Sequence, residues 1–145
     1  MQSPLFSVSM PEEIYKYGDL TYKIIASALK VHHILKNGFQ ELIYQRALEI
    51  EMRNAKIPFE REYELPIYYH NEIIGSRRVD FLVSELIAVE LKAITNLETV
   101  HLAQSLNYLE AFNLEIGLLI NFGQTSLQFK RLINKKYLNR DLQDF

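Results

Sequence analysis

The chain has 145 residues, of which 48% are apolar, and a net charge of −2. This length and apolar content fit one folded domain and exclude a chain that is wholly disordered. The absence of cysteine excludes disulfides, zinc–thiolate sites and iron–sulfur clusters, and it is consistent with a reducing compartment. The near-neutral charge disfavours a protein that coats nucleic acid, but it allows an enzyme that touches nucleic acid through a local patch.

Neither a membrane span nor a secretory leader is visible. No apolar run approaches the roughly 20 residues that a membrane helix needs, and the N-terminal stretch MQSPLFSVSM lacks a basic segment followed by an apolar one. We therefore expect a cytoplasmic protein. Residues 1–17 lack periodicity and contain Pro4 and Pro11, which predicts a loosely ordered arm. Residues 18–136 are expected to form the single domain, followed by a polar tail over residues 137–145.

Two helices are predicted before the first strand. The first begins at Asp19, a favourable N-cap residue, and carries apolar residues at helical spacing as far as residue 35. Asn37 and Gly38 end it, because glycine commonly follows the last residue of a helix. The second helix covers residues 41–55. Its apolar side is predicted to consist of Tyr44, Ala47, Leu48, Met52 and Ala55.

Three strands follow. Apolar residues alternate with polar ones over residues 63–69, which is typical of a half-buried strand, and Pro66 within it indicates an edge position. A polar turn at residues 70–72 leads to a second strand over residues 73–83, with a bend near Gly75. Ser84 and Glu85 form another turn before a third strand over residues 86–92. Such short connections predict antiparallel neighbours.

A third helix and two strands complete the domain. The helix is predicted over residues 97–112, with an apolar side formed by Leu102, Ala103, Leu106 and Leu109. A continuous apolar run at residues 115–122 predicts a central strand, which should lie parallel to the strand before the helix. Residues 126–133 form the last strand. The order α-α-β-β-β-α-β-β predicts an α/β fold with a mixed sheet covered by helices.

Three charged residues interrupt the apolar strands. Asp80 lies within one strand, and Glu90 and Lys92 close the next. Side chains alternate along a strand, so Glu90 and Lys92 share a face while Leu91 points to the other. A turn centred near residues 84–85 gives hairpin partners whose numbers sum to about 169–170. Asp80 should therefore lie opposite Val89 or Glu90, next to the second carboxylate.

Two neighbouring carboxylates in an apolar sheet repel one another unless a positive charge lies between them. Lys92 supplies part of that charge, and a divalent cation such as Mg²⁺ or Mn²⁺ could supply the rest. This interpretation gives a metal site that polarises a phosphodiester, with Lys92 orienting the attacking water. The alternative is that both acids lie on a solvent-exposed face and pair with Arg78 and Lys92.

Polar residues on the third helix add to the site hypothesis. His101, Gln104 and Tyr108 are spaced to form a stripe beside the apolar side of the helix. Because this helix directly follows Lys92, the stripe could overhang the site, with Gln104 holding water or phosphate. The alternative is that these residues form an ordinary solvent-exposed surface of the helix.

Basic residues gather in two places. Arg77 and Arg78 precede Asp80, and Lys130, Arg131, Lys135, Lys136 and Arg140 lie near the end of the chain. Arg77, Arg78, Lys130 and Arg131 are candidate nucleic-acid-binding residues. The alternative for the C-terminal group is a solvated terminus.

The D…E-x-K pattern on adjacent strands, within an α-β-β-β-α-β order, resembles the PD-(D/E)XK nuclease superfamily. The spacing of Gln104 and Tyr108 resembles the Q-x-x-x-Y element of its exonuclease-like branch. GFQELIY, residues 38–44, fits G-x-x-E-x-x-Y and precedes YYHNE, VDFLV, AVELKA, QSLNYL, LLINFG and LQFKR. This ordered set, over roughly residues 20–135, resembles the bacterial GxxExxY protein family of the same superfamily.

The resemblance implies a restriction-endonuclease-like αβββαβ core with an extra N-terminal helix and a C-terminal strand. It implies that Asp80, Glu90, the Leu91 carbonyl and Glu41 are metal ligands and that Lys92 is the catalytic lysine. From the residues alone, Glu41 is only a first-turn acid favoured by the helix dipole, and Gly38 a helix stop. The chain departs from the family in having Lys36 where a second glycine is common.

The function predicted from these residues is phosphodiester hydrolysis of nucleic acid, DNA in the first instance. It would depend on Mg²⁺ or Mn²⁺, with Gln104 and Tyr108 positioning the water. A non-catalytic module with the same fold, binding nucleic acid or a protein partner, is the alternative. A third possibility is an assembly protein that associates through Tyr68, Tyr69 and the strand containing Pro66. A homodimer is compatible with all three, and a partner protein could supply substrate recognition.

Overall fold

A computed structural model describes residues 17–137 of the chain. The helices and strands are α2 (Gly18–Leu35), α3 (Glu41–Asn54), β1 (Phe59–Tyr69), β2 (Glu72–Val83), β3 (Ile87–Lys92), α4 (Thr99–Phe112), β4 (Ile116–Asn121) and β5 (Gln128–Ile133). This order is the predicted one. The arm at residues 1–16 and the tail at residues 138–145 lie outside the described residues, and residues 135–137 are helical.

The five strands form one mixed sheet in the order β1-β2-β3-β4-β5. The pairs β1–β2, β2–β3 and β4–β5 are antiparallel, whereas β3 and β4 are parallel because α4 crosses between them. Phe81 pairs with Val89, so the next residues along these strands are Asp80 and Glu90. The predicted register and the predicted α/β fold are therefore confirmed.

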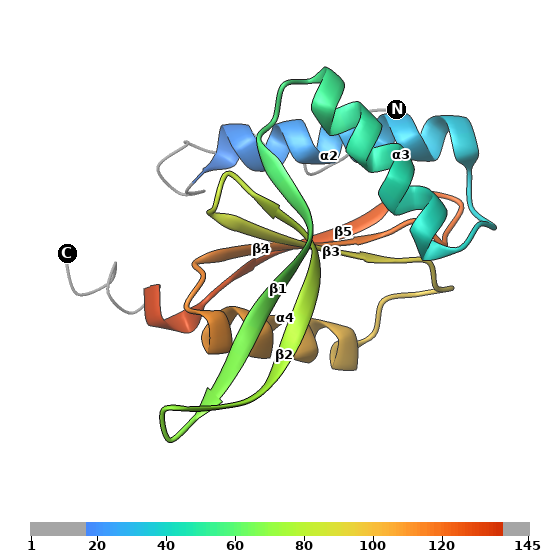
Figure 1. The fold of residues 1–145 in the computed structure, drawn as a ribbon. Coiled ribbons are helices and arrows are strands. Elements are labelled where there is room, and N and C mark those ends of the chain that lie inside the picture. The colour runs from blue at the N-terminus through green and yellow to red at the C-terminus, as the bar shows by residue number, and fades with distance from the viewer. Residues whose placement is uncertain (1–16, 138–145) are drawn as a thin grey trace, which may run out of the picture.

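Helices cover both faces of the sheet. Figure 1 shows α2 and α3 on one face and α4 on the other. The core on the α2–α3 side includes Tyr44, Leu48, Phe81, Leu91 and Phe122, all buried. A smaller core lies on the α4 side. It contains Val79, Leu82, Ala88 and Leu109. The continuous apolar run of β4 is explained by burial of all six of its residues.

The β1–β2 hairpin extends beyond the body of the domain (Figure 1). Pro66 lies in the outermost strand, as predicted, and an edge strand is where a residue without an amide hydrogen is tolerated. The register shifts between Ile67 and Tyr68, and this irregularity lies beside Gly75, where the sequence predicts a bend. Four large apolar side chains near the tip are exposed: Tyr68, Tyr69, Ile73 and Ile74.

Three local predictions are wrong. Asp19 is not an N-cap: Tyr17 occupies that position, and Asp19 lies in the first turn, where a carboxylate still favours the helix dipole. Ala55 follows the end of α3 and is exposed rather than buried. Ala103 is also exposed, because α4 turns only Leu109 fully into the core. Within residues 17–137, no helix is long and apolar enough to cross a membrane.

Candidate active site

The loop between α2 and α3 fixes the position of Glu41. Gly38 has a φ of 117°, in a region that residues with a side chain rarely adopt. The Tyr44 hydroxyl donates to the Lys36 carbonyl at 2.5 Å and accepts from the Phe39 amide at 3.2 Å. Its ring stacks on Phe122 with centroids 4.6 Å apart, which anchors α3 to the core. The G-x-x-E-x-x-Y spacing thus sets Glu41 at the first position of α3, directly after a clamped turn.

Asp80 is held from two sides. Its Oδ2 accepts from the Leu91 amide of β3 at 2.8 Å, and its Oδ1 accepts from Gln45 Nε2 of α3 at 2.8 Å. The Gln45 side chain is buried, and its oxygen accepts from Arg61 of β1. Burial raises the pKa of Asp80, and the bonds from Leu91 and Gln45 partly offset that rise. Asp80 therefore joins β2, β3 and α3 at one point.

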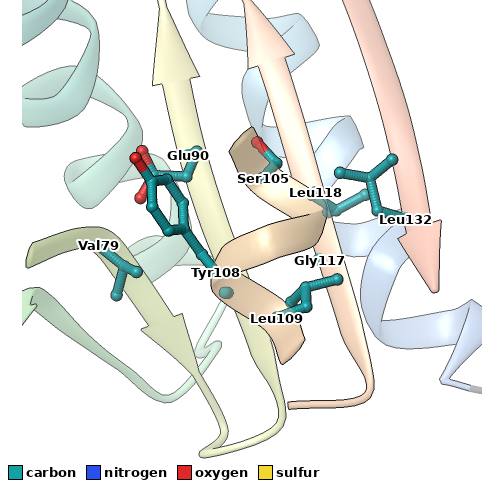
Figure 2. Close-up of a pocket in the computed structure, with 9 residues that line it drawn as sticks. Val79, Glu90, Ser105, Tyr108, Leu109, Gly117, Leu118 and Leu132 are labelled. Atoms are coloured by element: carbon teal, nitrogen blue, oxygen red, sulfur yellow. The ribbon is translucent and has the colours of Figure 1, made fainter. Parts of the chain in front are cut away.

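Glu90 lies on the side of the sheet that α4 covers. Figure 2 shows its carboxylate beside the Tyr108 ring. Glu90 Oε2 pairs with Arg77 at 3.2 Å, and the Arg77 guanidinium lies 4.1 Å from the Tyr108 ring centroid. Burial raises the pKa of Glu90 to about 7, with the Asp80 charge adding to the rise and Arg77 opposing it. Glu90 and Tyr108 line a cavity of about 10 Å³, the lower limit for holding one water.

Three carboxyl groups and one lysine influence one another electrostatically here. Burial also raises the pKa of Glu41, whose carboxyl group is partly enclosed although much of the residue is exposed. The negative charge of Asp80 raises the pKa of both Glu41 and Glu90. The positive charge of Lys92 lowers the pKa of all three acids. Because the charges act between α3, β2 and β3, the structure brings the four residues into one neighbourhood.

The segment after Lys92 is fixed by β4. The Lys92 carbonyl accepts from the Phe122 amide at 2.8 Å. Fully buried Asn121 donates to the Ile94 carbonyl and accepts from the Ile94 amide, both at 3.0 Å. A Cβ atom on Gly123 would lie 2.0 Å from the Ile94 carbonyl oxygen, so only glycine permits this approach. The end of β3, which carries Glu90 and Lys92, is therefore held rigidly.

Comparison with known proteins agrees with this arrangement. The sequence profile described as "PD-(D/E)XK nuclease superfamily" matches residues 18–132, most of the chain. The chain belongs to the PD-(D/E)XK nuclease superfamily. The narrower assignment to the GxxExxY family stays a prediction. No curated protein matches the chain.

Three solved chains match the fold. One, titled "Crystal structure of SSO0001", has a TM-score of 0.52 and 18% sequence identity. The match covers 89% of this chain and 66% of that protein, just under two thirds of its length. At this identity the likeness shows a shared fold and carries no inference about activity. The restriction-endonuclease-like core is thus supported by both the sequence profile and the sheet topology.

The remaining site candidates differ in their placement. Tyr108 contacts the site through Arg77, whereas Gln104 is solvent-exposed on α4. His101 forms a capping box with Glu98 at the start of α4, which gives it a local structural role. The Arg77 guanidinium pairs with Glu90, while its side chain remains 33% exposed, so contact with nucleic acid stays a prediction for this residue.

The other basic candidates lie outside the cluster. Arg78 is exposed and pairs in register with Glu64 of β1, away from the carboxylates. On β5, Lys130 is exposed and Arg131 is half-buried. These three residues therefore stay candidates for contact with the nucleic-acid backbone, at a distance from the acidic cluster.

Sequence reasoning missed Gln45. It follows the motif tyrosine directly, and nothing in a helical repeat distinguishes a buried glutamine from an exposed one. The available signal was its position: Gln45 lies four residues after Glu41 and therefore on the same side of α3. A polar residue on that side could reach the carboxylates that Glu41 approaches.

Members of this superfamily typically use divalent metal ions, and Glu41, Asp80 and Glu90 are the candidate side-chain ligands for such an ion in this chain. Within residues 17–137, no three His, Cys, Asp or Glu side chains lie close enough together to hold a metal ion as they stand. The chemistry nevertheless suits one: every candidate donor is an oxygen. Glu90 Oε1 is buried without a hydrogen-bond partner. A hard divalent cation would satisfy that oxygen and relieve the repulsion among the acids. The residues fit such an ion, provided that the three carboxylates can move closer together.

Proposed function

We propose that the protein is a metal-dependent nuclease that hydrolyses phosphodiester bonds in nucleic acid. The supporting observation is that Glu41, Asp80 and Glu90, from three different elements, all lie near enough to Lys92 for its charge to lower their pKa values. The pKa of each carboxyl group is raised, mainly by burial, so an added cation would favour the ionised forms of all three. Groups with perturbed pKa values gather at functional sites. Mutual repulsion among buried acids lowers folding stability, so a cluster of this kind is expected to serve a function.

In this proposal the protein residues have distinct roles. Glu41, Asp80, Glu90 and the Leu91 carbonyl would hold Mg²⁺ or Mn²⁺. A bound divalent ion polarises the scissile phosphate and lowers the pKa of water. Lys92, on the same strand face as Glu90, orients the attacking water and offsets negative charge that develops on the phosphate.

Two residues of α4 complete the assignment. Tyr108 supports the site through the Arg77 guanidinium that lies over its ring. Gln104, being exposed, is available to contact the substrate or the water that it brings. Gln45 and the Leu91 amide keep Asp80 fixed, so the acid loses little freedom on binding a cation.

The test is cleavage of labelled single-stranded, duplex and branched DNA, and of RNA, with Mg²⁺ or Mn²⁺ at low salt. Glu90→Gln and Lys92→Met are the diagnostic variants, and each should lower cleavage by at least about a hundredfold. Glu85→Gln and Lys23→Met, which change exposed residues of the same types, are the matched controls. Metal-dependent cleavage that survives both diagnostic substitutions would contradict the assignment, as would the absence of cleavage of every substrate.

A second function is favoured by one observation. The exposed Tyr68, Tyr69, Ile73 and Ile74 at the hairpin tip suit contact with another macromolecule more than with water. A non-catalytic module that binds a protein partner or a second copy of itself through this tip would leave the acidic cluster without a substrate. Light scattering of the purified protein and of a variant carrying Tyr68→Ser and Ile73→Ser shows whether this tip mediates self-association.

A further inference from the structure

Arg77 makes an unusual set of contacts for a residue beside a candidate metal site. Its guanidinium pairs with Glu90 Oε2 and stacks on Tyr108, so two neighbours fix its orientation. Within residues 17–137, no ion pair joins Lys92 to any of the three acids. Arg77 is therefore the cation that the acidic cluster contacts directly.

The pairing is incomplete on both sides. Arg77 Nε and Glu90 Oε1 are both buried without hydrogen-bond partners. A permanent structural pair of arginine and carboxylate would be expected to form two parallel bonds and satisfy these atoms. A pair that uses one bond only is more easily exchanged for another partner.

Arg77 would also compete with a metal cation for the Glu90 carboxylate. A carboxylate oxygen that accepts from a guanidinium is less available to a cation, and a positive charge nearby repels a second one. The ring of Tyr108 gives the guanidinium a surface on which to remain when Glu90 turns away. Arg78, the next residue along β2, has the same charge but is exposed and lies opposite Glu64.

We propose that Arg77 is a positioning residue that serves as a built-in substitute for the metal: it holds Glu90 in the metal-free protein and must release it when a divalent cation binds. This inference rests on the proposed metal site and adds a specific competitor to it. The metal affinity of the chain is then set partly by the strength of the Arg77–Glu90 contact. When only a fraction of the protein is in the state that can bind a ligand, the apparent affinity for that ligand falls in proportion to the fraction.

The experiment measures Mg²⁺ affinity directly, without substrate. Two-dimensional ¹H–¹⁵N spectra of the metal-free protein are followed during Mg²⁺ titration at about pH 8.5, where carboxylates are ionised. The Leu91 amide, which donates to Asp80, reports on the site in every variant. The Nε–Hε signal of Arg77, identified by its loss in Arg77→Met, reports on the exchange itself.

Arg77→Met, which keeps length and packing, should bind Mg²⁺ about tenfold more tightly than the unmodified protein. Arg77→Lys, which keeps the charge, should stay within about threefold, and the control Arg78→Met within about twofold. In the unmodified protein the Arg77 Nε–Hε signal should shift in step with the Leu91 amide.

The possible failures are distinguishable. If Arg77→Met binds Mg²⁺ equally or more weakly while Asp80→Asn abolishes binding, the competition is refuted and the metal site stands. An Arg77 signal that stays fixed while Leu91 shifts has the same meaning. If neither the unmodified protein nor Arg77→Met binds Mg²⁺, both the inference and the proposed metal site are wrong.

Discussion

Glu90→Gln should stabilise the metal-free protein at alkaline pH, because it removes a buried charge. The pKa of Glu90 is about 7 in the folded state, against 4.5 for an unperturbed glutamate. Each tenfold change in proton affinity corresponds to about 1.4 kcal/mol, so the ionised side chain costs the folded state about 3 kcal/mol. Glutamine resembles the protonated form and avoids this cost.

The sign of the pH dependence follows from proton binding. Between pH 4.5 and about 7 the folded protein holds a proton on Glu90 that the unfolded chain has released. The contribution of Glu90 to the free energy of unfolding therefore falls as pH rises through this window, and above it the loss is complete. Glu90→Gln should match the unmodified protein near pH 4.5 and exceed it above pH 7.

Urea denaturation followed by circular dichroism, in EDTA at about pH 5 and pH 8, measures the effect. At pH 8 the variant should be more stable by about 3 kcal/mol, or by about 6–12 °C in melting temperature. The exposed Glu85→Gln should show no such difference between the two pH values. If Glu90→Gln is less stable than the unmodified protein at pH 8, the ion pair with Arg77 outweighs burial, and the reasoning fails.

Three further substitutions test how the site is supported. Gln45→Leu should lower the free energy of unfolding by about 1–3 kcal/mol in urea denaturation, because Asp80 loses a buried donor. Tyr44→Phe should cost about 1 kcal/mol in the same assay, since the ring stays stacked and only the hydroxyl clamp on the loop is lost. Gly123→Ala should cost more than about 3 kcal/mol or prevent folding, judged by expression and melting temperature, because its Cβ would overlap the Ile94 backbone.

The controls for these variants are available in the chain. Gly75→Ala adds a methyl group where nothing lies within 4 Å, so it should melt within a few degrees of the unmodified protein. Gln40→Leu changes an exposed glutamine and should leave stability unchanged within about 0.5 kcal/mol. A Gly123→Ala protein as stable as Gly75→Ala would contradict the close approach. A Gln45→Leu protein no less stable than Gln40→Leu would show that the bond to Asp80 contributes nothing.

Hydrophobic periodicity and turn residues determined most of the fold. The change of period after Pro58 separates helices from strands, and the short turn at Ser84 and Glu85 fixes the β2–β3 register. This register places Asp80 and Glu90 next to one another without any knowledge of the rest of the molecule. Such features are local, because each depends on residues within about one turn or one hairpin.

Only the tertiary structure decided which groups complete the site. Gln45 bonds to Asp80, which lies 35 positions later in the sequence. Arg77 of β2 contacts Glu90 of β3 and Tyr108 of α4. The position of Glu41 was implied by resemblance and not by periodicity. These contacts depend on how the sheet twists and where the helices pack on it, and a residue pattern along one element does not contain that information. The sequence by itself therefore determined the strands that carry the acids, and the packing of the helices decided their partners.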